Sequence, residues 1–208
     1  MIFTDGSCTN GKVGAAASLY VDFNHIATLR YHLGNKTEHM VFEAKVVGLI
    51  LAAHLLLIRN EVTFLPMIFA NNQAVIRSGA RPSAKPGHYL LLHFRKQVHI
   101  LQERKDLNNT SINLNWIARH ADIKGNELAD REAKLVALKS NMASPCHSLQ
   151  KLLRKHLPLS TSAIKQVHEE HLQKKWQKEW QKSPRYNHIK ALNPKHTPRS
   201  FLKLAGRL

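Results

Sequence analysis

The N-terminal part of the chain alternates between short, β-rich apolar runs and residues that favour turns. Residues 2–4 form a short apolar run that ends at Asp5, and Gly6 directly after it favours a turn. Residues 13–21 and 25–33 form two longer β-rich runs, and the short Asp-Phe-Asn segment between them favours a hairpin connection. The pattern therefore predicts three strands that follow one another as an antiparallel meander.

Longer segments that favour helices begin near residue 38 and alternate with short strands. Residues 38–59 lack proline and are dense in Val, Leu, Ile and Ala, so this run predicts a mostly buried helix. The pattern then predicts a strand over 64–70, helices over 72–78 and 88–105, a strand over 111–118 and a helix over 126–138. Three meandering strands followed by this alternation predict an α/β domain, with a mixed five-stranded sheet and helices on both of its faces.

The pattern changes after the last of these helices. Residues 141–148 (NMASPCHS) favour a linker, which gives a domain over residues 1–140 and a separate segment over residues 149–208. A long basic run over residues 163–182 predicts a helix in this segment, and the three prolines that follow predict a partly irregular end. We therefore expect a basic α-helical C-terminal tail.

Charge is the strongest property of the whole composition. The 208 residues include 31 Lys and Arg against 14 Asp and Glu, which gives a formal net charge of +17. Residues 151–208 alone hold 14 Lys and Arg against 3 Asp and Glu. Such an excess favours polyanionic partners, chiefly nucleic acid, although charge also keeps a basic protein soluble without such a partner.

The sequence shows no signal for secretion or membrane insertion. The N-terminus lacks a basic segment ahead of an apolar run, and the longest apolar stretch, residues 46–58, is interrupted by His54 and is too short to cross a bilayer. The two cysteines, Cys8 and Cys146, are too few for a disulfide framework and fit a reducing compartment. We therefore expect an intracellular protein, in the cytoplasm or the nucleus, with no membrane partner.

Two acidic residues occupy positions where α/β proteins often perform chemistry. Asp5 ends the first predicted strand, and Asp130 lies in the first turns of the last helix of the domain. Each also has an ordinary structural interpretation, Asp5 as a turn residue and Asp130 as an acid near a helix N-terminus. Another strand end carries amides, and the neutral Asn71 there leaves open whether this position never needed charge or has lost it.

Together these segments resemble type 1 ribonuclease H. The resemblance covers about residues 1–140 and rests on DGS at residues 5–7, FANNQAVI at residues 69–76 and HADIKGNELAD at residues 120–130. It is greatest for the ribonuclease H regions of non-LTR retrotransposon polyproteins, which the tail also resembles in LPLSTSAIKQ and SPRYNHI. The resemblance implies a ribonuclease H-like fold, a retroelement origin and polyprotein segments outside this chain. It also implies that RNA–DNA hybrid is the partner and that its RNA strand is cut.

The resemblance implies a cofactor as well, two Mg²⁺ ions held by four carboxylates. The four matching positions are Asp5, Lys45, Asn71 and Asp130, so Asp5 and Asp130 remain as the metal ligands. The summed charge of these four side chains is −1, where four carboxylates give −4, and an ammonium close to a divalent ion is strongly repelled. The degenerate positions Lys45 and Asn71 therefore predict weakened metal binding and a cleavage activity that is lost or impaired.

Glu43 is a possible acidic substitute for the degenerate helix position. It lies two residues before Lys45, a rotation of about 200° on a helix, so the two side chains point to nearly opposite sides. Only a shifted helix register turns Glu43 toward Asp5. The alternative to an inactive domain is thus an active endoribonuclease with Mg²⁺-dependent hydrolysis of the RNA strand of hybrids. A non-functional retroelement fragment is a further alternative.

Other residues are candidates for proton transfer or nucleic-acid contact. By resemblance, His120 lies on a loop near the scissile phosphate and assists proton transfer or product release; it is otherwise an ordinary loop histidine. Ser7, Cys8 and Asn10 fall in the first predicted turn, which by resemblance approaches the hybrid backbone, and small polar groups suit phosphate and 2′-hydroxyl contacts. A simple tight turn explains the same three residues.

Two tryptophans in the basic tail share one helix face. Trp176 and Trp180 are four residues apart and are interleaved with lysines, an arrangement that suits phosphate binding and base stacking. The other interpretation, which we favour, is that both rings dock the helix on the domain or on a partner. No feature of the sequence predicts an oligomeric state.

Overall fold

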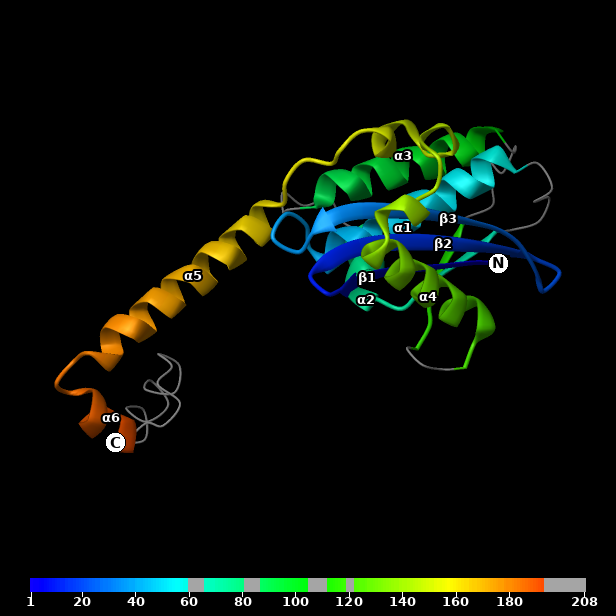
Figure 1. The fold of residues 1–208 in the computed structure, drawn as a ribbon. Coiled ribbons are helices and arrows are strands. Elements are labelled where there is room, and N and C mark those ends of the chain that lie inside the picture. Colours follow the sequence, from blue (N-terminus) through cyan, green and yellow to red (C-terminus); the bar gives the residue numbers. More distant parts are fainter. Residues whose placement is uncertain (60–65, 81–86, 105–111, 119–121, 193–208) are drawn as a thin grey trace. The chain divides into compact units, whose positions relative to one another are not determined.

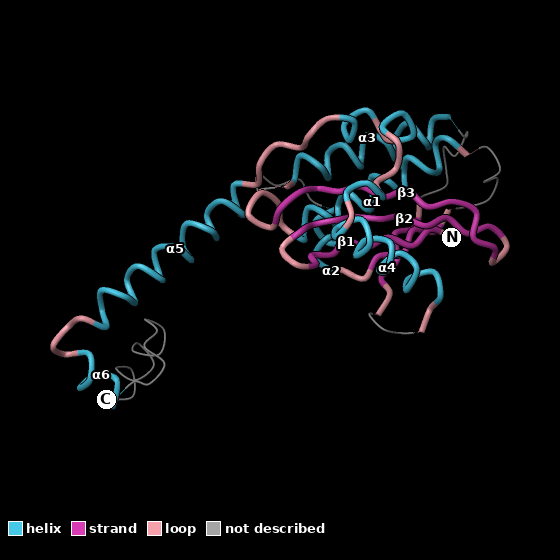
Figure 2. The backbone as a smooth tube through the Cα atoms, viewed as in Figure 1, coloured by secondary structure: helices cyan, strands magenta, loops and turns pink. Residues whose placement is uncertain are grey.

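The computed structural model describes residues 1–59, 66–80, 87–104, 112–118 and 122–192. The chain divides into two compact units, Met1–Ile164 and Lys165–Leu208, and each is described by itself. The first unit contains the sheet and the helices that pack on it (Figure 1; Figure 2).

Five strands form one mixed sheet in the first unit. They span Ile2–Thr9 (β1), Lys12–Val21 (β2), Asn24–Asn35 (β3), Met67–Ala70 (β4) and Asn113–Trp116 (β5). Their order across the sheet is β3-β2-β1-β4-β5. Strands β1, β2 and β3 form an antiparallel meander, whereas β4 runs parallel to both β1 and β5. The mixed five-stranded sheet expected from the sequence is confirmed.

The first strand is longer than the sequence pattern predicts. β1 continues through Asp5 and Gly6 and pairs with β2 as far as Thr9. The chain turns only at Asn10 and Gly11, whose φ angles of 50° and 73° are those of a two-residue hairpin turn with both central residues left-handed. The expected end of the strand at Asp5 was therefore wrong, because pairing with β2 keeps the Asp-Gly-Ser segment extended. The adjacent Asn-Gly pair was the better turn signal.

Helices cover both faces of the sheet, as predicted. α1 (Val41–Ile58) and α3 (His88–Arg104) pack together on one face, and α4 (Lys124–Leu138) covers the opposite face against β1 and β2 (Figure 1). The short helix α2 (Gln73–Ala80) follows β4. The larger apolar core lies on the α1 side of the sheet, and a smaller cluster around Phe3 lies on the α4 side.

Helix α1 is the central element of the core. By length and composition its 18 residues, with a mean hydropathy of 2.1, would suffice to cross a membrane. In the structure 72% of this segment is buried inside the first unit, where α1 contacts β1, β2 and α3. A helix that is apolar on all sides is expected at such a place, because each side meets another element of the core.

The segment after α4 packs onto the domain. Three short 3₁₀ turns occupy Ser140–Met142, Cys146–Ser148 and Lys151–Arg154. Leucines spaced four residues apart then join the core, namely Leu149, Leu153 and Leu157. The compact unit accordingly reaches Ile164, beyond the end expected at residue 140, and it includes the expected linker over residues 141–148. The physical reason is that these leucines bury an apolar stripe that would otherwise face water.

The described residues of the second unit lie mainly in two helices. α5 (Thr161–Gln181) begins at the end of the first unit and matches the helix predicted over residues 163–182. α6 (Tyr186–Leu192) forms where an irregular end was expected, because Pro184 precedes the helix and does not interrupt it. Nearly all described side chains of α5 within this unit are exposed.

Candidate functional site

Three polar side chains from separate elements meet where β4 ends. Asp5 lies in β1, Lys45 lies in α1, and Asn71 directly follows β4. Lys45 Nζ donates to Asp5 Oδ1 at 2.5 Å and to Asn71 Oδ1 at 2.6 Å. Asn71 Nδ2 in turn donates to Asp5 Oδ2 at 3.0 Å. We call these three residues the Asp5 cluster.

Sheet register and helix packing explain why these residues meet. β4 pairs in parallel with β1 up to the residues just before Asp5 and Asn71, so the two side chains follow on neighbouring strands. Gly6 lets α1 approach the sheet, since a Cβ at this position would lie only 2.4 Å from the backbone nitrogen of Lys45. The side chain of Lys45 therefore starts within reach of both partners.

Asp5 and Lys45 are buried, Asn71 is half-buried, and the three side chains satisfy one another. The side chain of Asp5 is 1% exposed and that of Lys45 is 9% exposed. The backbone N–H of Gly6 also donates to Asp5 Oδ1, at 2.7 Å, so both carboxylate oxygens accept hydrogen bonds. A buried carboxylate needs a positive partner and hydrogen bonds, and in this protein the chain itself supplies them.

The residues of the cluster do not fit a pair of Mg²⁺ ions. Mg²⁺ requires hard oxygen ligands in near-octahedral geometry, whereas the group held between Asp5 and Asn71 is the ammonium of Lys45. Across the described ranges of the chain, no group of three or more His, Cys, Asp or Glu side chains is placed to hold a metal. A lysine cation thus occupies the place where the resemblance puts metal ligands.

Asp130 forms its contact elsewhere. Its carboxylate lies 2.6 Å from Lys134 Nζ, one turn further along α4, and its side chain is 26% exposed. Within the part of the chain that the structure describes, no hydrogen bond or ion pair joins Asp130 to the Asp5 cluster. The structure therefore brings three of the four predicted positions into direct contact and leaves Asp130 outside them.

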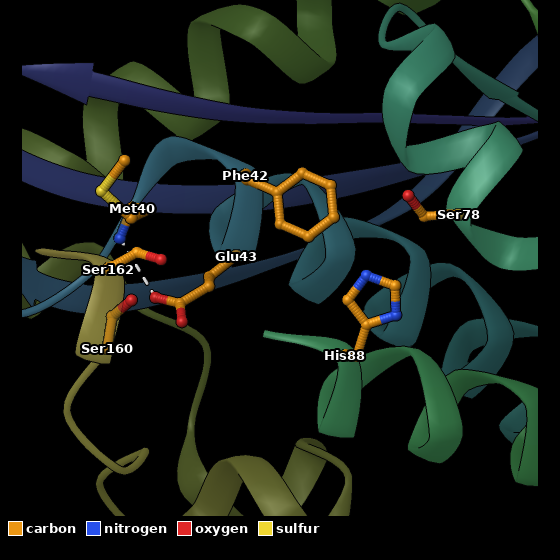
Figure 3. Close-up of a pocket in the computed structure, with 7 residues that line it drawn as sticks. All are labelled: Met40, Phe42, Glu43, Ser78, His88, Ser160 and Ser162. Carbon is orange, nitrogen blue, oxygen red and sulfur yellow. Dashed lines mark hydrogen bonds between the residues drawn. The ribbon is translucent and has the colours of Figure 1, made fainter. Parts of the chain in front are cut away.

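Glu43 points away from the Asp5 cluster. Its Oε2 accepts a hydrogen bond from the backbone N–H of Met40 at 3.0 Å, which forms part of a capping box at the start of α1. The same oxygen lies 3.4 Å from His39 Nδ1, and the side chain lines a separate pocket (Figure 3). The helix register thus places Lys45 beside Asp5, and the shifted register that would let Glu43 replace it does not occur.

The candidate backbone contacts near the N-terminus are spread over a strand and a turn. Ser7 and Cys8 lie in β1 and pair with β2, while Asn10 begins the hairpin turn. Cys8 and Asn10 are exposed and Ser7 is half-buried, so all three are accessible from the surface. Their expected location in one turn after Asp5 was wrong for the same reason as the strand end. His120 lies outside the described residues.

The two tail tryptophans form a stacked pair in the second unit. The rings of Trp176 and Trp180 lie 5.9 Å apart between centroids and are nearly parallel, at 6°. Trp176 is 50% exposed, and exposed lysines accompany the pair along α5. Within this unit the pair therefore presents an aromatic surface close to positive charge.

Sequence reasoning missed the pocket beside Glu43. Its lining comes from the start of α1, from α2, from α3 and from the start of α5 (Figure 3). These segments are too far apart in the chain to share a sequence pattern. The only local signal was Glu43, an acid in the first turn of α1. The members that line it are Met40, Phe42, Glu43, Ser78, His88, Ser160 and Ser162.

The first unit is similar in structure to type 1 ribonucleases H. No protein-family model matches the sequence, and no curated protein matches it. The crystal structure of LC11-RNase H1 in complex with RNA/DNA hybrid matches with a TM-score of 0.51 and 20% identity, over 67% of this chain and 97% of that one. A second structure of LC11-RNase H1, isolated from compost by a metagenomic approach, matches with a TM-score of 0.51 and 18% identity, over 67% and 96%. The chain therefore contains a domain with the ribonuclease H-like fold.

Proposed function

We propose that this chain is a ribonuclease H-like domain of retroelement origin that binds RNA–DNA hybrid and has lost or nearly lost the ability to cut it. The fold, the net charge of +17 and the hybrid bound to one similar structure support the binding. The segments that resemble retrotransposon polyproteins support the origin, and further polyprotein segments would lie outside this chain. Two exposed free cysteines support an intracellular location.

The observation that carries the loss of cleavage is the position of Lys45. Its ammonium lies 2.5 Å from Asp5 and 2.6 Å from Asn71, so the one carboxylate of the cluster is already neutralised. A divalent ion at this place would have to displace a buried cation and would gain only one charged ligand from the cluster. The site is therefore stable without metal and poorly suited to acquire it.

Binding does not depend on this cluster. Ser7, Cys8 and Asn10 on the β1 hairpin offer small polar groups to the hybrid backbone. Trp176 and Trp180 offer a stacking surface beside lysines, which suits an unpaired stretch of strand. Because Trp176 is 50% exposed, we prefer this role to the docking favoured from the sequence and assign nucleic-acid contact to these five residues.

The alternative is an active hybrid endoribonuclease that uses Mg²⁺, with His120 assisting. Two retained acids, Asp5 and Asp130, favour it, and Asp130 keeps a partly exposed carboxylate. It requires Lys45 to leave Asp5, and Glu43 does not compensate because it is bonded to the backbone of Met40. The geometry supports the inactive domain better.

One experiment separates the two functions. The purified chain is titrated with labelled RNA–DNA hybrid for binding and is incubated with the same hybrid in Mg²⁺ or Mn²⁺ for cleavage. We expect saturable binding without cleavage. Cleavage by the wild-type chain that disappears in Asp5→Asn would establish the active enzyme instead, since a contaminating nuclease would not respond to that substitution. Absence of hybrid binding at low salt would contradict both.

A further inference from the structure

A pocket of about 290 Å³ lies next to the start of α1, on the side away from the Asp5 cluster. Its size suits a single side chain or a similar small group, because pockets for drug-sized ligands begin near this volume. Glu43 stands between its two walls, with Ser160 and Ser162 on one side and Phe42 and His88 on the other (Figure 3). Every residue of the lining belongs to the first unit.

Glu43 is a buried carboxylate with one oxygen unused. The residue is 2% exposed, and its Oε2 accepts from the backbone N–H of Met40. In the described part of the chain no hydrogen bond reaches Oε1, and the nearest basic group is His39 Nδ1, 3.4 Å from Oε2. A positive partner and hydrogen bonds stabilise a buried carboxylate, and Oε1 is the oxygen of Glu43 that is left to accept them from a ligand in the pocket.

The negative charge of Glu43 also acts on a neighbouring group. Burial raises the pKa of Tyr89 to about 12, and the negative charge of Glu43 adds to the effect. The hydroxyl of Tyr89 is itself buried without a hydrogen-bond partner among the described residues. Tyr89 does not line the pocket, so its raised pKa reflects burial and the negative charge of Glu43 and is not a second contact for a ligand.

The rest of the lining fits the other parts of an organic cation. The rings of Phe42 and His88 are inclined by only 22° with centroids 6.4 Å apart. The face of Phe42 can attract a cation, and both rings can pack on methylene groups. The hydroxyl oxygens of Ser160 and Ser162 lie on the carboxylate side of the pocket (Figure 3). Together with Glu43 Oε1, they can accept the three N–H donors of one ammonium group.

We propose that this pocket binds a primary alkylammonium group, with the ammonium at Glu43 Oε1 and the alkyl chain along Phe42 and Met40. Because the backbone N–H of Met40 already donates a hydrogen bond to Oε2, the carboxylate offers only Oε1 as an acceptor to the ligand. A guanidinium gains most from two parallel hydrogen bonds to one carboxylate, so the pocket favours ammonium over guanidinium. A primary alkylammonium group could come from a lysine side chain of a partner protein or from a free polyamine. The site is independent of the hybrid-binding function proposed above.

The test is a titration of the full chain followed by NMR of its backbone amides and by calorimetry. The probes are n-butylammonium, n-butylguanidinium and the neutral isostere n-butanol. We expect saturable shifts at residues 40–43, 88 and 160–162 with n-butylammonium, at least tenfold weaker binding of the guanidinium, and no saturation with n-butanol. Spermidine and a short lysine-containing peptide are then compared, and the tighter binder identifies the source.

Two variants locate the binding. Glu43→Gln keeps an oxygen for the Met40 backbone and loses the charge, so n-butylammonium binding should fall at least tenfold. Glu127→Gln removes an equal charge from the exposed first turn of α4 and should leave binding unchanged. Equal binding to both variants would overturn the proposal. If Glu43→Gln does not fold, saturation of the wild-type chain by n-butanol, or preference for the guanidinium, would overturn it equally well.

Discussion

Lys45 joins two elements of the sheet through one ammonium group. Its partners are Asp5 in β1 and the half-buried Asn71 after β4, and the ion pair with Asp5 is nearly inaccessible to water. An ion pair buried in this way adds little stability compared with apolar residues, but removing one partner leaves a charge without compensation. Lys45 is therefore expected to stabilise the fold at the very position where catalysis would need an acid.

Replacing Lys45 by alanine tests this role in the fold. Lys45→Ala leaves the Asp5 carboxylate buried with only the Gly6 and Asn71 donors, so the free energy of unfolding should fall by about 3–5 kcal/mol. The matched control is Lys134→Ala, which removes an ion pair from the part-exposed Asp130 and should cost under about 1 kcal/mol. Urea denaturation of both variants measures the difference. Equal losses would show that the Asp5 cluster is not the compensated charge that we describe.

Restoring acids to the cluster should create affinity for a divalent ion. Lys45→Glu combined with Asn71→Asp replaces an ammonium and an amide by two carboxylates beside Asp5. We expect calorimetry to detect Mg²⁺ or Mn²⁺ binding that the wild-type chain lacks. Saturating metal, at about 100 times its Kd, should also raise the free energy of unfolding by about 2.7 kcal/mol.

A matched pair of changes controls for added negative charge. Lys174→Glu combined with Asn187→Asp makes the same change of charge at exposed positions of the second unit. This control should bind no more metal than the wild-type chain. If the restored cluster behaves like the control, the motif positions have been assigned to the wrong residues.

Most of the cluster was predictable from the sequence, and its contacts were not. The motifs identify Lys45 and Asn71 as replaced acids, and the 3.6-residue helix period excludes Glu43. The sequence does not show that Asp130 forms an ion pair with Lys134 of its own helix, because Asp130 could also pair with residues of other elements. Nor does it show that the lysine reaches both strands, which follows from the close approach of α1 at Gly6.

The β1–β2 hairpin shows how tertiary pairing can override local turn signals. Asp5-Gly6-Ser7 has the composition of a turn, yet it is extended in the middle of β1. The true turn uses the Asn10-Gly11 pair, which supplies two left-handed residues at little steric cost. Glycine therefore has two different roles on one hairpin, close packing at Gly6 and backbone conformation at Gly11.

Substitution of the two glycines separates these roles. A Cβ at Gly6 would lie 2.4 Å from Lys45 N and 2.5 Å from Ala44 C, both backbone atoms of α1, so Gly6→Ala must push helix and strand apart. We expect a loss of about 1–3 kcal/mol in the free energy of unfolding. Gly11→Asn places a residue that tolerates positive φ where nothing lies within 4 Å, and it should cost much less. Thermal unfolding of both variants measures this order, and a reversed order would contradict the assigned roles.

The segment after α4 shows where composition misleads about a boundary. Residues 141–148 have the polar, proline-containing character of a linker, yet Ser144 exchanges backbone and side-chain hydrogen bonds with Arg30 of β3. The following leucines complete the core. Their spacing of four residues was visible in the sequence, but only the structure shows that they cover a face of the core.

Charge is distributed unevenly between the two units of the molecule. Residues 165–208 hold 11 of the 31 Lys and Arg in the chain and 3 of the 14 Asp and Glu. The fold of the first unit was predictable from patterns and motifs, whereas the basic second unit has few buried side chains to define a function from its packing. Its contribution is therefore best measured through electrostatics.

Salt dependence of hybrid binding tests that contribution. The logarithm of the binding constant falls linearly with the logarithm of the salt concentration. On a duplex, each phosphate that the protein no longer neutralises should make this slope less steep by about 0.9. A chain that ends at Ile164 lacks the 11 basic residues and should bind with a clearly shallower slope than the full chain. Trp176→Ala removes stacking but no charge, so it should lower affinity for a hybrid with a single-stranded extension while the slope stays the same. Fluorescence anisotropy at several salt concentrations measures all three chains. An unchanged slope in the shortened chain would show that the basic helices do not touch the nucleic acid.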